Sequence, residues 1–93
     1  SRRAYGGNEV SSERLRELES LIISYKAFAE SDDGVAILKD LSRECYEKEL
    51  TFVDGNPNGT AFNEGKRYVM LHIRRFIDTN VDDVRELSKK LER

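Results

Sequence analysis

The block from Phe52 to Ile77 sets the strongest limit on the fold, because a turn-rich segment runs directly into a long apolar stretch. Glycine and proline in the segment Leu50–Thr60 prevent regular structure there and predict a loop. Apolar residues then recur at three- and four-residue spacing from Ala61 to Asp78, which is typical of an α-helix. They occupy more than one side of that helix, so we expect it to be the central, most buried element.

The same periodicity predicts three further helices around this block. The first begins near Ser12, an N-cap candidate, and runs to Glu30. The second extends from Asp32 to Glu49, and the segment Ser31–Gly34 supplies its cap. The last spans Val81–Leu91 behind the cap candidate Asn80. The sequence therefore predicts an all-α protein, a compact bundle of three to four helices with a Gly/Asn/Pro loop between the second and the third.

Length and composition fit one small domain. A chain of 93 residues rarely forms two independent cores, and we divide it into a flexible N-terminal arm, residues 1–12, and a helical domain, residues 13–93. No run approaches the roughly 18 apolar residues that a membrane span needs, and the start, SRRAYGG, lacks the apolar core of a signal peptide. The single cysteine, Cys45, excludes an intramolecular disulfide, fits a reducing compartment and is expected to be buried and inert.

The loop also resembles a calcium site in its first half. Four residues follow the D-x-N-x-N-G order of such a loop: Asp54, Asn56, Asn58 and Gly59. The bidentate glutamate should come at the twelfth position, which is Gly65, and Glu64 stands one residue too early. A site formed by Asp54, Asn56, Asn58 and Glu64 would therefore bind weakly, and the same residue types are common in any tight loop. We expect no metal and no other cofactor.

Two segments, DDGVAILKDL at Asp32–Leu41 and TAFNEGKRYVMLHIRRFI at Thr60–Ile77, resemble a family of small proteins of tailed bacteriophages and related gene-transfer elements, the Bbp-type phage domain. The resemblance covers about half of the chain, and FNEGKR is its most specific piece. Genes of that family lie among those for virion assembly, and no catalytic mechanism is assigned to it. The resemblance implies a non-enzymatic protein of the virion or of its assembly, located in the host cytoplasm or the virion and not secreted. Its partners would be other phage proteins or a second copy of itself.

Five residues around the motif are expected to shape the loop and the helix start: Phe52, Phe62, Glu64, Gly65 and Arg67. We expect Phe62 to fold back onto Phe52 and close the loop. Gly65 has no side chain, so another helix or the loop could approach closely there. Arg67 has two interpretations: it pairs with Glu64 or with loop carbonyls, or it contacts phosphate or an acidic partner surface.

Basic residues support an alternative function, a DNA-associated packaging or ejection accessory protein. The candidate contacts lie in the arm and along one edge of the third predicted helix: Arg2, Arg3, Tyr5, Arg67, Arg74 and Arg75. A net charge of −2 disfavours this function, and a solvated or salt-bridged edge explains the arginines more simply. The lone His72 has no ligand at metal-binding spacing and no nucleophile beside it, so we expect a core or boundary residue and no catalytic site.

Overall fold

The computed structural model describes residues 11–91, and all the regular structure in that range is α-helical. The four helices, in chain order, are α1 (Ser12–Glu30), α2 (Asp32–Glu44), α3 (Pro57–Asp78) and α4 (Val81–Leu91). The all-α prediction with four helices is confirmed.

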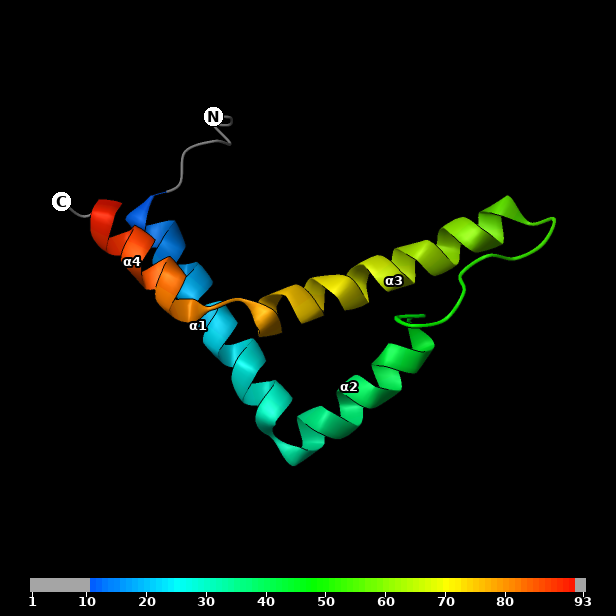
Figure 1. Ribbon diagram of the computed structural model, residues 1–93, viewed down its shortest axis with the longest axis horizontal. Helices are drawn as coiled ribbons and strands as arrows, with labels where there is room; N and C mark the ends of the chain where they lie inside the picture. Colours follow the sequence, from blue (N-terminus) through cyan, green and yellow to red (C-terminus); the bar gives the residue numbers. More distant parts are fainter. Residues whose placement is uncertain (1–10, 92–93) are drawn as a thin grey trace.

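The helices are arranged around α1, which contacts each of the other three (Figure 1). Helix α4 runs antiparallel along the first half of α1, α2 turns back from its end, and α3 reaches its middle. Helices α2 and α3 contact each other only slightly. The prediction that the third helix is central was therefore wrong: its apolar residues lie on several sides, but only Met70 among them is fully buried.

The molecule is more open than the compact bundle that was predicted. Its radius of gyration is 17.1 Å, whereas a compact chain of about 100 residues has about 13 Å. Its extents are 55 × 37 × 17 Å, so it is much thinner than it is long or wide. In the described part of the chain the buried hydrophobic side chains are few: Leu15, Ile22, Leu38 and Met70. The molecule is flat and open because α2 and α3 do not close on each other.

One serine forms the elbow between α1 and α2. The Ser31 hydroxyl donates a hydrogen bond to the Phe28 carbonyl at 2.7 Å and accepts one from the Gly34 amide at 2.9 Å. It therefore ends α1 and caps α2, as its position in the sequence predicted. At the other end of α1 the N-cap is Ser11, one residue before the expected Ser12, and it accepts from the Arg14 amide at 3.1 Å.

Helix α2 ends at Glu44 and not at the predicted Glu49. Tyr46 adopts the left-handed conformation, with φ of 57°. The Glu47 amide bonds the Ser42 carbonyl at 3.0 Å and the Tyr46 amide bonds the Arg43 carbonyl at 3.4 Å, which is the Schellman motif of a helix end. Glycine or asparagine usually marks that position, and here neither does, so the sequence contained no signal for this end.

Helix α3 begins at Pro57, four residues before the predicted start. The Asn56 side chain accepts from the Gly59 amide at 2.9 Å and is the N-cap. Proline is favoured at the first helical position because its missing N–H would have no partner there. Because α2 also ends early, the loop between α2 and α3 occupies residues 45–56 instead of the predicted 50–60, so it is shifted toward the N-terminus and almost unchanged in length.

Helix α4 has the predicted bounds, and Asn80 caps it by accepting from the Asp82 amide at 2.9 Å. Ser88 is buried against the rest of the protein, whereas Leu87 and Leu91 are about half exposed. An ion pair between Arg85 and Glu19, 2.9 Å long, joins α4 to α1.

Candidate interaction surface

Two side chains at the start of α3 hold the preceding loop in place. The Val53 amide donates to the Thr60 hydroxyl at 2.8 Å, and the Asn63 amide group donates to the Thr51 carbonyl at 3.1 Å. Asn63 is buried, so this bond is shielded from water. We did not predict either contact from the sequence, although Thr and Asn in the first turns of a helix are residues that can bond a neighbouring loop. The loop is thus positioned by hydrogen bonds.

The expected closure of the loop by two aromatic rings is not observed. Phe52 and Phe62 each remain about two-thirds exposed, which excludes an extensive contact between them. The Phe62 ring lies 5.1 Å from the Lys66 ammonium, and Phe52 lines a shallow hollow together with Pro57. Both rings are available to another molecule.

The residues of the calcium hypothesis do not surround a common point. Asn58 and Glu64 both belong to α3, where six residues separate positions by about 9 Å along the axis and about 120° around it. Asn56 uses its side-chain oxygen to cap the helix, and Asp54 lies in the turn before it. Within residues 11–91, no three His, Cys, Asp or Glu side chains are grouped as metal ligands. The early start of α3 explains the difference from a calcium loop.

One of the three arginines of α3 is ion-paired, so the three do not form a basic edge whose charge is wholly available. Arg74 donates to both carboxylate oxygens of Glu47, at 2.9 and 3.2 Å, so it is salt-bridged, as the simpler interpretation predicted. These hydrogen bonds hold the pKa of Glu47 below its ordinary value, although partial burial opposes the shift. Arg75 is exposed, and Arg67 forms no hydrogen bond or ion pair with the described residues, so its expected pairing with Glu64 is not observed. The candidates in the arm, Arg2, Arg3 and Tyr5, lie outside the described residues.

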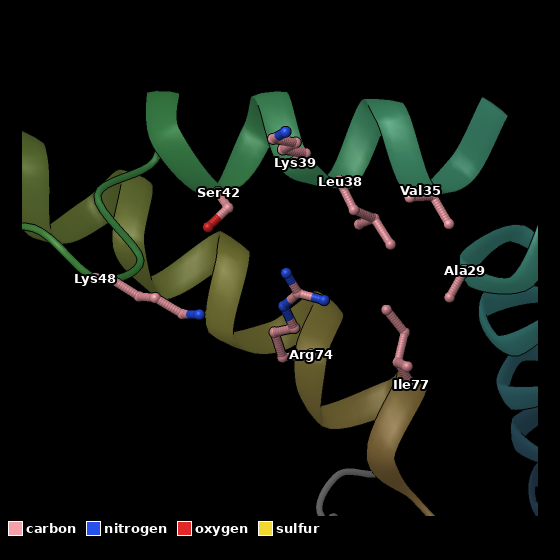
Figure 2. Close-up of a pocket in the computed structure, with 8 residues that line it drawn as sticks. All are labelled: Ala29, Val35, Leu38, Lys39, Ser42, Lys48, Arg74 and Ile77. Carbon is pink, nitrogen blue, oxygen red and sulfur yellow. The ribbon is translucent and has the colours of Figure 1, made fainter. Parts of the chain in front are cut away.

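A hollow of about 480 Å³ lies between the end of α1, α2 and the C-terminal half of α3 (Figure 2). One end is polar and the other apolar, and the lining residues are Lys39, Ser42, Lys48 and Arg74 at the first end and Ala29, Val35, Leu38 and Ile77 at the second. Because Arg74 is bonded to Glu47, the positive charge that remains comes from Lys39 and Lys48.

An aromatic junction fixes the end of α3 on α1. Tyr25 stacks on Phe76 with ring centroids 4.8 Å apart, and His72 lies 4.9 Å from Phe76 and 6.4 Å from Tyr25. The Lys26 ammonium donates to the Ile77 carbonyl at 2.6 Å and so satisfies the last turn of α3. His72 is a boundary residue in this junction, as predicted.

From this junction an apolar surface extends along both helices, and we call it the α1/α3 strip. It comprises Leu21, Tyr25 and Phe28 of α1 and Phe62, Val69, His72 and Phe76 of α3. A hollow lined by Leu21, Tyr25 and Phe28 adjoins a second one lined by Leu21 and Phe76, so the surface is continuous across the junction. Leu21, Phe28, Phe62 and Val69 are 39–68% exposed, so its apolar area is on the order of 500 Å², which is the size of the largest apolar patch on a typical soluble protein, a patch that is often functional.

These features define a small, open, all-α protein with an extended apolar surface across two helices. The chain belongs to the Bbp19-like phage protein family, whose model matches residues 25–91. This match confirms the resemblance seen in the sequence and extends it through α4. A search of curated proteins gave no match, and neither did a search of solved structures. None of the helices within residues 11–91 has the length and apolar character that crossing a membrane requires.

Proposed function

We propose that this phage protein is a non-enzymatic protein–protein interaction domain that acts in the virion or in its assembly, in the host cytoplasm. The observation that carries the proposal is the exposure of the α1/α3 strip. An apolar patch of this size is often functional on a soluble protein, because its exposure to water is unfavourable unless a partner covers it. The family supplies the phage setting.

The free energy available from covering the strip favours a partner whose surface matches the strip in shape. Covering about 500 Å² of apolar surface at roughly 25 cal/mol per Å² gives about 12 kcal/mol before costs. Association itself costs about 4–15 kcal/mol in lost translational and rotational freedom. The two quantities are comparable, so only a partner that also fits the strip closely would bind stably.

The test is quantitative mass spectrometry of purified virions and of assembly intermediates. We expect the protein at a fixed ratio to a major structural protein, and we expect Val69→Glu to lose incorporation because it places a charge in the strip. Ile37→Glu is the matched control, since Ile37 is 45% exposed on α2, outside the strip. Absence of the wild-type chain from both fractions would refute the proposal.

A DNA-associated packaging or ejection role is the second candidate. Lys39 and Lys48 beside Arg74 favour it, because together they could contact a phosphate group. A gel shift at several salt concentrations tests it: phosphate-driven binding weakens steeply with salt. Binding that disappears in Lys39→Gln/Lys48→Gln would support this role, and no shift at low salt would exclude it.

A further inference from the structure

We propose that the partner on the α1/α3 strip is a second copy of this chain, with the two α3 helices packed antiparallel across a twofold axis near Val69. The inference rests on the proposed function, since it names the partner of the same surface. Five positions of α3 carry it, and we call them the α3 seam: Phe62, Gly65, Val69, His72 and Phe76.

The seam has the spacing of a helix-pairing surface. Its residues recur at intervals of three and four, which is the a/d pattern of packed helices, and none of them is charged. The N-terminal part is uncovered: Phe62 is 68% exposed and Val69 is 52% exposed. A Cβ atom at Gly65 would meet nothing within 4 Å, so this glycine leaves a notch that no neighbouring segment of the protomer fills.

The notch and the rings of the seam are arranged for self-association. Gly65 lies four residues before Val69, and His72 lies three residues after it. When two α3 helices pack antiparallel about a twofold axis at Val69, the Gly65 notch of each copy lies opposite the part of the other seam that contains His72 and Phe76. Both halves of the interface are then identical, as twofold symmetry requires. A parallel pair would instead place notch on notch and leave both unfilled.

Charges beside the seam fit the same orientation. Glu64 and Arg75 are both exposed, lie on one side of α3 and form no ion pair within the described residues. Reversal about Val69 brings Glu64 of one copy level with Arg75 of the other, and the symmetry repeats this opposite-charge pair at the far end. The antiparallel register therefore brings opposite charges together at both ends.

Area and stability favour a second copy over a different protein. A standard interface covers about 800 Å² on each partner, and about 65% of a homodimer interface is apolar, or about 520 Å². The strip offers about 500 Å². The protomer also has few buried side chains, so the partner that covers the strip must be present whenever the chain is folded. A second copy of the chain meets this condition, because it is synthesised together with the first.

Sedimentation equilibrium on the 93-residue chain, from about 1 to 200 µM, is the first test. We expect a dimer, and we expect Val69→Glu to weaken it about 100-fold, because two like charges meet at the axis. Ile37→Glu should dimerise as the wild type does. A wild-type chain that remains a monomer over the whole range, or a Val69→Glu variant that dimerises as tightly as wild type, overturns the proposal.

A second pair of variants does not depend on how well Val69→Glu folds. Glu64→Arg places like charges beside Arg75 and should weaken the dimer several-fold, and Glu64→Arg/Arg75→Glu should restore it. Circular dichroism should show the same helix content in both. A double variant that dimerises no better than the single one overturns the antiparallel register.

These outcomes are separable from those of the proposed function. A monomeric wild type whose incorporation into virions still depends on Val69 would overturn self-association and leave the interaction role standing. A dimer that is absent from virions and assembly intermediates would refute the role and support the second copy.

Discussion

Replacing Gly34 by alanine should open the elbow between α1 and α2. A Cβ atom on Gly34 would lie 1.5 Å from the Phe28 carbonyl oxygen, 2.5 Å from its carbon and 2.8 Å from the Ser31 hydroxyl oxygen. Real Cβ atoms essentially never approach another heavy atom closer than 3.0 Å, and the closest atoms here belong to the backbone. One helix must therefore move by about 1.5 Å against the other, since no rotamer relieves this clash.

The cost follows from the hydrogen bonds that the movement breaks. Three bonds meet at the elbow: the Ser31 hydroxyl and amide donate to the Phe28 carbonyl at 2.7 and 3.2 Å, and the Gly34 amide donates to the Ser31 hydroxyl at 2.9 Å. At about 1 kcal/mol each they contribute about 3 kcal/mol. Alanine recovers up to about 1 kcal/mol through its helix propensity. The expected net loss is about 2 kcal/mol in the free energy of unfolding.

Urea unfolding followed by circular dichroism measures this loss, at one fixed protein concentration because self-association would shift the apparent stability. Asp33→Ala is the matched control: it introduces alanine into the same turn at an exposed position and should cost only about 0.5 kcal/mol through the helix dipole. If Gly34→Ala proves as stable as Asp33→Ala, the close approach of Phe28 to α2 does not exist and the reasoning fails.

Four further changes test other contacts. Glu47→Gln should cost about 1–2 kcal/mol by breaking the paired hydrogen bonds with Arg74. The pKa of Glu47 is lower in the folded protein than its ordinary value of 4.5. Its contribution to folding stability is therefore complete above pH 4.5 and disappears as the pH falls through the pKa of the folded state. Wild type should thus lose more stability than Glu47→Gln in urea titrations below pH 4.5. Lys26→Met keeps the aliphatic stem but removes the bond to the last turn of α3, and should lower stability by about 1 kcal/mol in the same assay. Thr60→Val should speed hydrogen exchange of the Val53 amide while amides of α1 stay protected; unchanged exchange would contradict the role of this hydroxyl. Millimolar calcium should leave the melting temperature unchanged relative to chelator, and a rise would revive the calcium site.

The sequence predicted the helices better than their ends. Periodicity located all four helices. The caps Ser31 and Asn80 could be predicted from the sequence because their side chains bond backbone amides only a few residues away. The start of α3 was predicted four residues too late, although Asn56 followed by Pro57 has the residue types of a cap and a first helical position. The end of α2 could not be predicted. It depends on the left-handed conformation of Tyr46, whose ring lies 5.0 Å from the ammonium of Lys66, twenty residues later in the chain.

The candidate site shows a different limit of sequence reasoning. Apolar residues on several sides of α3 predicted a helix buried within its own chain, yet Phe62, Tyr68 and Val69 are more than half exposed. A helix covered by a partner has the same pattern as one covered by its own protomer. Likewise, Gly65 indicated a close approach in the sequence, but within the protomer no segment approaches it. The pattern of apolar residues identifies which side chains are buried in a contact, but it does not identify the molecule that makes the contact.

Two contacts of α1 orient α3 within the protomer. The Ser31 elbow turns the chain at one end of α1, while Tyr25 stacked on Phe76 and Lys26 bonded to Ile77 anchor the end of α3. A second copy would therefore meet a preformed seam, so its binding orders few groups and costs less than coupled folding would. Association then stabilises the fold by mass action, in proportion to the logarithm of concentration. Variants at the seam should consequently lose stability by an amount that grows with protein concentration, whereas the cost of Gly34→Ala should be the same at every concentration, because the hydrogen bonds of the elbow lie outside the α3 seam.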